Sequence, residues 1–393
     1  MKDDIVIVAA KRTALGNFLG QFANLSAPEL GAHAHSATLA AAQITSDAID
    51  TVISGCVLQA GIGQAPARQA ALLAKLPNHV NATTINKMCG SGMQAVIYAH
   101  DAIRAGSAQI VLAGGMESMS QAPYLLRKAR TGYRLGHGEI LDHMLLDGLE
   151  DAYTKGKLMG CFAEDTANLF EFTRTLQDDY AAESMRRALA AQQNAAFLDE
   201  ITPITYTDKH KTYTVTQDES PDLTKIDKIV NLKPSFCANG SITPASSSSI
   251  ADGAASLLLM TLKRAHELGL KPLARIVGHA CHSQEPQWFA LAPIEAIRKL
   301  LTQINWQITD VDLFEINEAF AVVSMAAIQS LQLDPNKVNI HGGACALGHP
   351  LGASGARIIV TLLHALKRHK QQRGIASLCI GGGEATAIAI ELL

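Results

Sequence analysis

The chain has 393 residues, of which 48% are hydrophobic and 18% charged, and its formal net charge is −3. This length predicts two or three packed units, and the excess of apolar over charged residues excludes an intrinsically disordered protein. The small negative charge, without a broad basic stripe, argues against nucleic-acid binding, and the apolar runs are too short for a membrane span.

The N-terminal segment predicts a short buried strand and no signal peptide. Met1 is followed by three charged residues, and residues 5–10 are an unbroken apolar run. The seven cysteines are scattered through apolar or glycine-rich stretches, as free thiols in a reducing compartment would be. Residues 390–393 are not a peroxisomal address. We therefore expect a cytoplasmic protein.

Cys89 opens the first motif that carries chemistry. It lies in residues 86–93, where a turn of small residues leads into a helical pattern with Met93, Val96, Ile97 and Ile103 on one face. A helix N-terminus has unpaired N–H groups and a favourable dipole, so we expect it to favour the thiolate of Cys89. A buried structural cysteine is the alternative. The glycines at 90 and 92 count against it, because they permit close approach of a ligand and free N–H groups for an oxyanion.

The two halves of the chain repeat one strand–helix–strand pattern. The matching segments are 91–92 with 354–355, 109–113 with 375–380, and 50–55 with 312–317. Chance similarity of motifs built from small residues is the alternative. The repeat predicts two similar α/β halves with mostly buried sheets.

Residues 121–248 differ in composition from both halves. They contain a charged helix at 178–193, a polar region at 202–230, and most of a serine run at 246–249 that is a candidate flexible linker. The apolar segment 250–258 then returns to the core as a helix or strand. We expect an inserted lobe over the site. The predicted division is 1–120 with 249–271, 121–248, and 272–393.

The densest motif is the glycine-rich segment 341–355, which contains His349 directly before Pro350. The proline keeps His349 extended and outside the following helix. A second thiol, Cys379, ends the strand 375–380. If the halves are duplicated, equivalent strand ends place Cys89 and Cys379 close together near a pseudo-twofold axis. Two thiols and a histidine would then supply a nucleophile and an acid–base group.

Two other interpretations of the glycine-rich segment are weak. His341, Cys345 and His349 are spaced four apart, but the intervening glycines disfavour a helical ligand face, so we predict no metal site. No Gly-x-Gly-x-x-Gly follows the first strand, so a dinucleotide site is not expected. Asn317, after the strand 311–316, is either a turn residue or an amide that orients a water or polarises a thioester carbonyl.

Taken in order, these motifs resemble those of the thiolase family. The motifs are residues 89–92, 114–120, 317–320, 348–350 and 379–383. The similarity runs from Ile5 to Ala389 and is greatest to the biosynthetic thiolases, the acetyl-CoA acetyltransferases. It implies an α/β fold of two duplicated halves with buried mixed sheets, layered α-β-α-β-α, plus an inserted loop lobe.

The resemblance also implies the reaction, a reversible Claisen condensation of two acetyl-CoA to acetoacetyl-CoA and CoA through an acyl-Cys89 intermediate. His349 would take the proton of Cys89, and Cys379 would move the proton on the α-carbon. His349 and a water on Asn317 would form one oxyanion hole, and the N–H groups of Cys89 and Gly381 the other. No cofactor would be bound permanently, and coenzyme A thioesters would be the substrates.

The same resemblance implies the binding residues for coenzyme A. They are Met159, Phe236, Ser248, Ala319 and Phe320. Thiolases specific for acetoacetyl-CoA usually have histidine where this chain has Leu158, and a more apolar pocket there favours longer 3-ketoacyl chains. A degradative thiolase is therefore the alternative. Residues 130–136 resemble the family's tetramerisation loop, which implies a homotetramer built from two dimers.

Two further classes compete with this interpretation. A ketoacyl synthase shares the duplicated fold but lacks a second reactive cysteine, so Cys379 argues against it. A non-catalytic acyl-CoA or lipid-binding protein would not need Cys89, His349 and Cys379 together.

Overall fold

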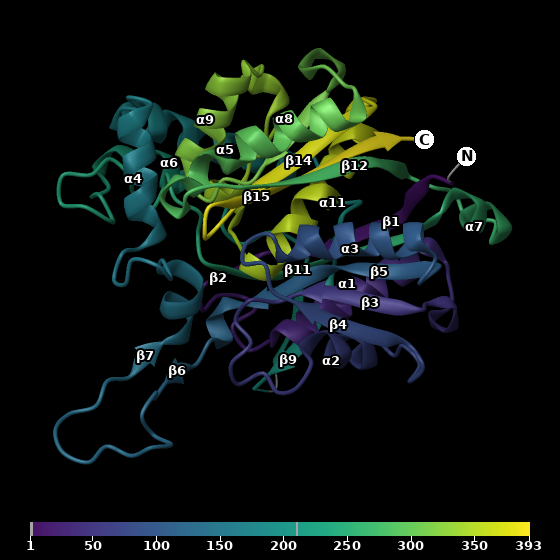
Figure 1. The fold of residues 1–393 in the computed structure, drawn as a ribbon, viewed down its shortest axis with the longest axis horizontal. Helices are drawn as coiled ribbons and strands as arrows, with labels where there is room; N and C mark the ends of the chain where they lie inside the picture. Colours follow the sequence, from purple (N-terminus) through teal and green to yellow (C-terminus); the bar gives the residue numbers. More distant parts are fainter. Residues whose placement is uncertain (1–2, 210) are drawn as a thin grey trace.

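The structure, a computed structural model, describes residues 3–209 and 211–393, so residues 1 and 2 of the predicted N-terminal half lie outside it. Helices and strands alternate in five layers: the two halves of one 11-stranded sheet enclose a central pair of helices, and further helices cover both outer faces (Figure 1). This confirms the predicted α-β-α-β-α arrangement.

The first part of the chain comprises the first half and the lobe. Its strands are β1 (Ile5–Thr13), β2 (Gly16–Asn17), β3 (Thr51–Gly55), β4 (Asn81–Ile85), β5 (Ile110–Ser118), β6 (Tyr124–Leu125), β7 (Leu141–Asp142), β8 (Ile201–Thr202), β9 (Ile204–Asp208), β10 (Lys211–Val215) and β11 (Ala251–Thr261). Its helices are α1 (Ala27–Ala42), α2 (Pro66–Leu73), α3 (Ser91–Ala105), α4 (Met159–Leu169), α5 (Arg174–Gln193), α6 (Leu223–Ile226) and α7 (Leu262–Glu267).

The second half is shorter and more regular. Its strands are β12 (Ala274–Ser283), β13 (Leu313–Ile316), β14 (Arg373–Ile380) and β15 (Glu384–Leu392). Its helices are α8 (Ala292–Ile304), α9 (Ala321–Leu331), α10 (Ala344–Leu347) and α11 (Leu351–His369).

The sheet order reveals the duplication directly. The first half is ordered β1-β11-β5-β3-β4 and the second β12-β15-β14-β13, and a parallel bridge from Phe314 to Val338 stands where β4 stands in the first. A short antiparallel pairing of β1 with β12, at Val6 and Ile7, joins the two halves. The predicted repeat is therefore confirmed, with β3 matching β13, α3 matching α11, and β5 matching β14.

The same topology contradicts the predicted equivalence of the strand ends at Cys89 and Cys379. Cys379 lies in β14, whose counterpart is β5, whereas Cys89 precedes α3, whose counterpart α11 is preceded by His349. Cys89 and Cys379 thus do not occupy equivalent strand ends. The pseudo-symmetry relates Cys89 to the position of His349 instead.

The central helices α3 and α11 pack closely because glycines line their crossing. A Cβ atom at Gly92 would lie 2.8 Å from the backbone nitrogen of Ala356, and one at Gly355 would lie 2.4 Å from that of Met93. The predicted apolar face of α3 is buried here, with Met93, Val96, Ile97 and Ile103 at most 4% exposed. This contact fixes the start of α3, and with it Cys89, against the second half.

The strands that flank the central helices are buried on both faces. β5 is buried along its whole length, and β11 is buried at all but its last residue, Thr261. Sheets covered by helices on both sides need such continuous small and apolar runs. The segment after the serine run is therefore a strand, one of the two alternatives the sequence left open.

The lobe differs in detail from its prediction. α5 begins at Arg174, four residues before the expected start, because the hydroxyl of Thr173 accepts a hydrogen bond from the N–H of Leu176 and caps the helix. The polar region contains the hairpin β9–β10. The serine run is not a flexible linker, since Ser247 bridges to Phe320 and is 8% exposed.

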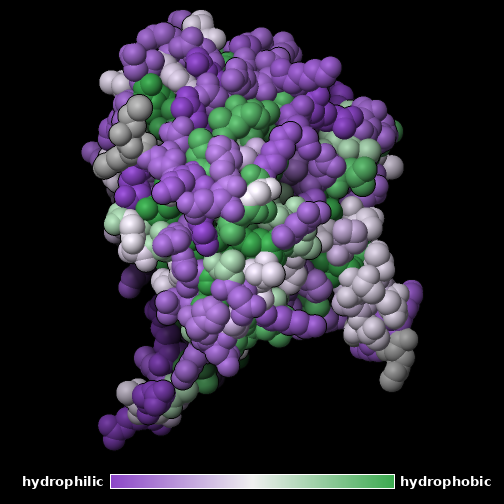
Figure 2. Space-filling model, turned by 90° about the vertical axis from the view of Figure 1, so that its right-hand side faces the viewer, coloured by the Kyte–Doolittle hydropathy of each residue, from purple (hydrophilic) through white to green (hydrophobic). Residues whose placement is uncertain are grey.

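None of the helices in the described part of the chain combines the length and apolar character needed to cross a bilayer. On the face that carries the chain termini, hydrophilic residues cover most of the surface and hydrophobic residues lie in patches between them (Figure 2).

Candidate active site

A cavity of about 260 Å³ lies where the two halves meet the lobe. We call it the Cys89 cavity. It brings together seven of the residues expected from the sequence, namely Cys89, Met159, Ser248, Ala319, Phe320, His349 and Gly381. Other walls come from residues 146–153 of the lobe. Residues from all three predicted parts of the chain thus converge on one space.

Cys89 stands in a tight turn at the start of α3. Met88 has a left-handed φ of 48°, and the hydroxyl of Ser91 donates to the carbonyl of Met88 at 2.6 Å, which closes the turn. Gly90 lets Ile380 pack against this turn, because a Cβ there would lie 2.4 Å from Cδ1 of Ile380 and that side chain would have to shift. The predicted position at a helix N-terminus is confirmed.

The expectation that this position favours the thiolate is not met in the free protein. Burial raises the pKa of Cys89 to about 11, and the charge of Glu117 adds to the shift. The backbone N–H groups of Gly381 and of Cys89 itself hydrogen-bond the sulfur and act in the opposite direction, but burial outweighs them. The thiol therefore needs a base that removes its proton.

This shift makes alkylation of Cys89 a direct test. With a pKa of about 11, the rate of iodoacetamide modification at Cys89 is expected to rise about tenfold per pH unit from neutral pH towards 10. Peptide mass spectrometry separates Cys89 from the exposed Cys237 and Cys281. A rate that levels off near pH 7 would contradict this, since it would indicate a preformed thiolate.

His349 is positioned as a neutral base. It is 5% exposed, and its Nδ1 lies 2.5 Å from the hydroxyl of Ser354, which itself donates to the carbonyl of Pro350 at 2.9 Å. Ser354 has a single proton, and with that proton on Pro350 the hydrogen of a neutral His349 lies on Nδ1, which leaves the lone pair on Nε2. Burial, and then the charge of Arg357, lower the pKa of His349 to about 3.

Asn317 completes this side of the site. Its Nδ2 lies 3.5 Å from Nε2 of His349, and its Oδ1 is buried without a partner among the described residues. The carboxylate of Glu318 anchors the loop after β13. It accepts hydrogen bonds from Tyr180, Ser184, Asn339 and the N–H of Cys345. Asn317 and His349 thus present two polar groups at one point.

Cys379 is fully buried, in the apolar cluster that also contains Ala319 and Phe320 of the cavity wall. Burial raises its pKa well above the ordinary value, and the charge of a Cys89 thiolate raises it further, which places the two sulfurs near each other. Its sulfur does not line the cavity in this structure, whereas Gly381 does. The predicted proximity of the two thiols holds, although the symmetry argument for it does not.

Two residues that position the site were not predicted from the sequence. Ser354 sets the tautomer of His349, and only its place five residues after His349, near one turn into α11, could have pointed to it. Glu117 accepts hydrogen bonds from the N–H groups of Val57, Leu58 and Gly352, and burial raises its pKa to about 7. It ties the loop after β3 to the start of α11.

Two residues expected to contact coenzyme A lie outside the Cys89 cavity. Phe236 packs edge-on against Phe320, with ring centroids 5.7 Å apart, and lines a neighbouring cavity of about 440 Å³ together with Ser248. Leu158 precedes α4 and pairs with Glu150, and it is not among the residues that line either cavity. The structure therefore does not place Leu158 at the acyl pocket.

The three residues weighed as metal ligands in the glycine-rich segment point to different partners. Nε2 of His341 lies 3.2 Å from Nε2 of His369, Cys345 is buried against Glu318, and His349 faces Ser354.

Known proteins with the same features form one family. Residues 5–263 match the family model described as "Thiolase, N-terminal domain", and residues 270–392 match "Thiolase, C-terminal domain". An Escherichia coli protein named acetyl-CoA acetyltransferase is 47% identical over 390 residues, with 99% of both chains covered. Arabidopsis thaliana acetyl-CoA acetyltransferase 2 is 46% identical over 393 residues, covering 99% of this chain and 97% of its own.

A solved structure agrees with these matches. The crystal structure of the Bacillus anthracis acetyl-CoA acetyltransferase superposes with a TM-score of 0.97 at 41% identity, over 100% of this chain and 99% of that one. The duplicated fold, the motifs in order and the matches along the whole length agree, and the chain belongs to the thiolase family.

Proposed function

We propose that this protein is an acetyl-CoA C-acetyltransferase that condenses two acetyl-CoA to acetoacetyl-CoA and CoA, reversibly, through an acetyl-Cys89 intermediate. The observation that carries the proposal is the convergence on one cavity of the Cys89 thiol, the N–H of Gly381 and Nε2 of His349, with the buried thiol of Cys379 close to Cys89. A thiol that is protonated at rest beside a neutral imidazole is suited to acyl transfer.

In the first half-reaction, Nε2 of His349 takes the proton of Cys89, and the thiolate attacks the carbonyl of acetyl-CoA. The oxyanion of the tetrahedral intermediate is stabilised by the N–H groups of Cys89 and Gly381, each of which lowers the barrier by about 3 kcal/mol. The CoA thiolate leaves and takes the proton of Cys379, so that Cys89 is acetylated, Cys379 is a thiolate and CoA departs as the thiol.

In the second half-reaction, the Cys379 thiolate removes a proton from the α-carbon of a second acetyl-CoA. Burial makes Cys379 a strong base, since it raises its pKa well above the ordinary value. His349 keeps the proton of Cys89 in this step because the negative charge of the Cys379 thiolate favours the imidazolium. The imidazolium and a water held by Asn317 stabilise the enolate oxygen. The enolate attacks the acetyl group, the Cys89 thiolate leaves, and it recovers its proton from His349.

Coenzyme A is proposed to reach Cys89 along the surface formed by Met159, Ser248, Ala319 and Phe320, all of which line the cavity. Ser248 donates its N–H to the carbonyl of Ala319 at 3.0 Å, which joins the serine run to the loop after Asn317. Phe236 extends this path into the neighbouring cavity, where the positive charge of Lys225 suits a phosphate.

The proposal also covers the division of the chain, its oligomeric state and its compartment. The halves are taken as 1–120 with 249–271 and as 272–393, with 121–248 as the lobe, in keeping with the return of β11 to the first sheet. The exposed loop between β6 and β7, which contains residues 130–136, is proposed to pair dimers into a homotetramer. A reaction that needs two free thiols suits the reducing cytoplasm, and all seven cysteines are free.

The reaction is tested by incubating the protein with acetoacetyl-CoA and CoA and following the loss of the enolate absorbance. We expect turnover to acetyl-CoA, and we expect a chain-length series of 3-ketoacyl-CoA substrates to show a preference for acetoacetyl-CoA. A preference for longer chains would instead establish a degradative thiolase. No turnover with any 3-ketoacyl-CoA would refute both.

A further inference from the structure

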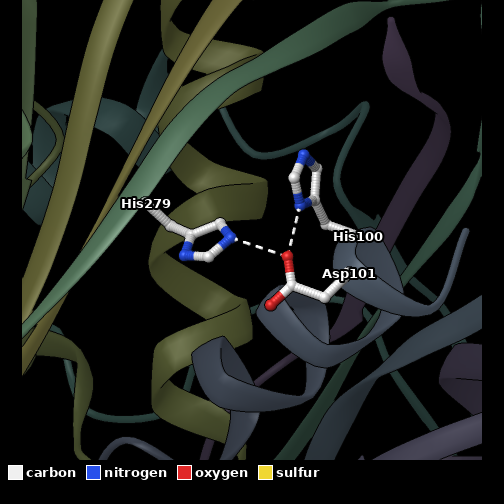
Figure 3. A group of neighbouring side chains, drawn as sticks. All are labelled: His100, Asp101 and His279. Carbon is white, nitrogen blue, oxygen red and sulfur yellow. Dashed lines mark hydrogen bonds and ion pairs between the residues drawn. The ribbon is translucent and has the colours of Figure 1, made fainter. Parts of the chain in front are cut away.

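Away from the Cys89 cavity, three side chains with metal-ligating atoms meet between the two halves. His100 and Asp101 come from α3, and His279 comes from β12 (Figure 3). We propose that His100, Asp101 and His279 bind one zinc ion, with water in the fourth position. The proposal is independent of the reaction proposed above.

The three ligand atoms already lie near the spacing that zinc needs. Oδ1 of Asp101 is 2.9 Å from Nδ1 of His100 and 3.0 Å from Nε2 of His279, and all three atoms lie within 4.8 Å of one another. A tetrahedral zinc ion with bonds of about 2.0–2.1 Å separates its ligand atoms by about 3.3 Å. The imidazole rings stand at 83° to each other, so neither blocks the other's approach to a shared ion.

The three ligand atoms are already held together by hydrogen bonds. Nδ1 of His100 and Nε2 of His279 both hydrogen-bond Oδ1 of Asp101. Zinc binding would replace these hydrogen bonds with metal bonds to the same three atoms, and no oxidant or reductant is needed.

Solvent reaches the site through Asp101, whose side chain is 52% exposed, while those of His100 and His279 are 10% and 20% exposed. Two imidazoles and one carboxylate with an open fourth position are a common donor set for zinc. The positive charge of Arg104 acts on His100 and opposes a cation. Arg104 is, however, bonded to the carbonyl of Asp3, which holds it. Cys281 is engaged elsewhere, since its thiol contacts Gln94.

The placement sets the ion apart from the Cys89 cavity and between the two halves. Asp101 lies ten residues beyond Ser91, the first residue of α3, which is about 15 Å along the helix and away from Cys89. The ion would join α3 of the first half to β12 of the second. No sequence motif indicates this cluster, because Asp101 and His279 are 178 residues apart and only the fold brings them together.

The test is zinc titration of the metal-stripped, full-length protein by calorimetry, repeated with cobalt to record the absorption of a four-coordinate site. Asp101→Asn and His279→Asn each remove one ligand, and Asp101→Asn also preserves side-chain size. Asp179→Asn, an exposed acid on α5, is the matched control. Any zinc that binds to cysteine thiols elsewhere contributes equally to the titrations of the wild type and the three variants, so this contribution can be subtracted.

We expect one zinc ion per chain, bound at least about tenfold more weakly in both ligand variants and unchanged in Asp179→Asn. Zinc should raise the midpoint of thermal unfolding in the wild type and in the control only. Far-UV circular dichroism without metal establishes that each variant is folded, and if Asp101→Asn is not, His279→Asn carries the test. The proposal would be overturned if the zinc affinity and the cobalt spectrum were unchanged in the ligand variants. It would also be overturned if the wild type showed no saturable binding at millimolar zinc.

Discussion

Replacing Cys379 with alanine is expected to lower the rate of acetoacetyl-CoA formation by about 10²–10⁴-fold, the usual contribution of a general acid–base group. The acetylation of Cys89 should be affected far less, because the CoA thiolate is a good leaving group without the proton that Cys379 supplies. Exchange of labelled CoA into acetyl-CoA reports acetylation alone. Exchange of the α-hydrogens of acetyl-CoA with solvent reports the step that needs Cys379, and it should be nearly abolished.

Cys345→Ala is the matched control for this variant. Cys345 is also a buried thiol whose pKa is raised by burial, but its sulfur faces the carbonyl of Glu318 and not Cys89. We expect Cys345→Ala to keep most of its activity. If Cys379→Ala formed acetoacetyl-CoA at near the wild-type rate, another group would have to remove the α-proton. If both variants lost CoA exchange, the loss would reflect folding and not acid–base chemistry.

The duplicated fold was predictable because its signals are local and repeated. Small residues open both central helices, and apolar runs mark the strands that follow, so each half independently indicates the same unit. The length of the lobe elements was less predictable. The start of α5 depends on a cap at Thr173, and the order of the serine run depends on partners more than 70 residues away in the chain, such as Phe320.

The chemical groups of the site were predictable, but their protonation states were not. Cys89, His349 and Gly381 stand in short motifs whose residue types already limit their roles. The pKa of Cys89 depends on burial by segments of both halves, so the helix N-terminus alone gave the wrong sign. Ser354 decides the tautomer of His349 only because it spends its proton on Pro350, a detail of three-dimensional geometry.

A loss of similar size at neutral pH is expected for His349→Gln. With a pKa of about 11, only about one Cys89 in 10⁴ is a thiolate at pH 7, so acetylation depends on proton removal by Nε2 of His349. We expect this variant to acetylate Cys89 about 10²–10⁴-fold more slowly at pH 7, as measured by CoA exchange. His341→Gln, at a buried histidine in the same glycine-rich segment, should retain activity.

The pH dependence distinguishes the proposed role of His349 from a purely structural one. Burial keeps the pKa of His349 near 3, so the wild-type base is neutral at all pH values above about 4, and its rate should change little between pH 6 and 9. In His349→Gln the rate should instead rise about tenfold per pH unit as Cys89 ionises, so that the defect shrinks steadily towards the pKa of about 11. A defect of constant size across this range would show that His349 stabilises the oxyanion without acting as the base, because added hydroxide cannot replace a hydrogen-bond donor. A defect that shrinks with pH identifies proton removal from Cys89 as the step that burial makes difficult and His349 makes possible.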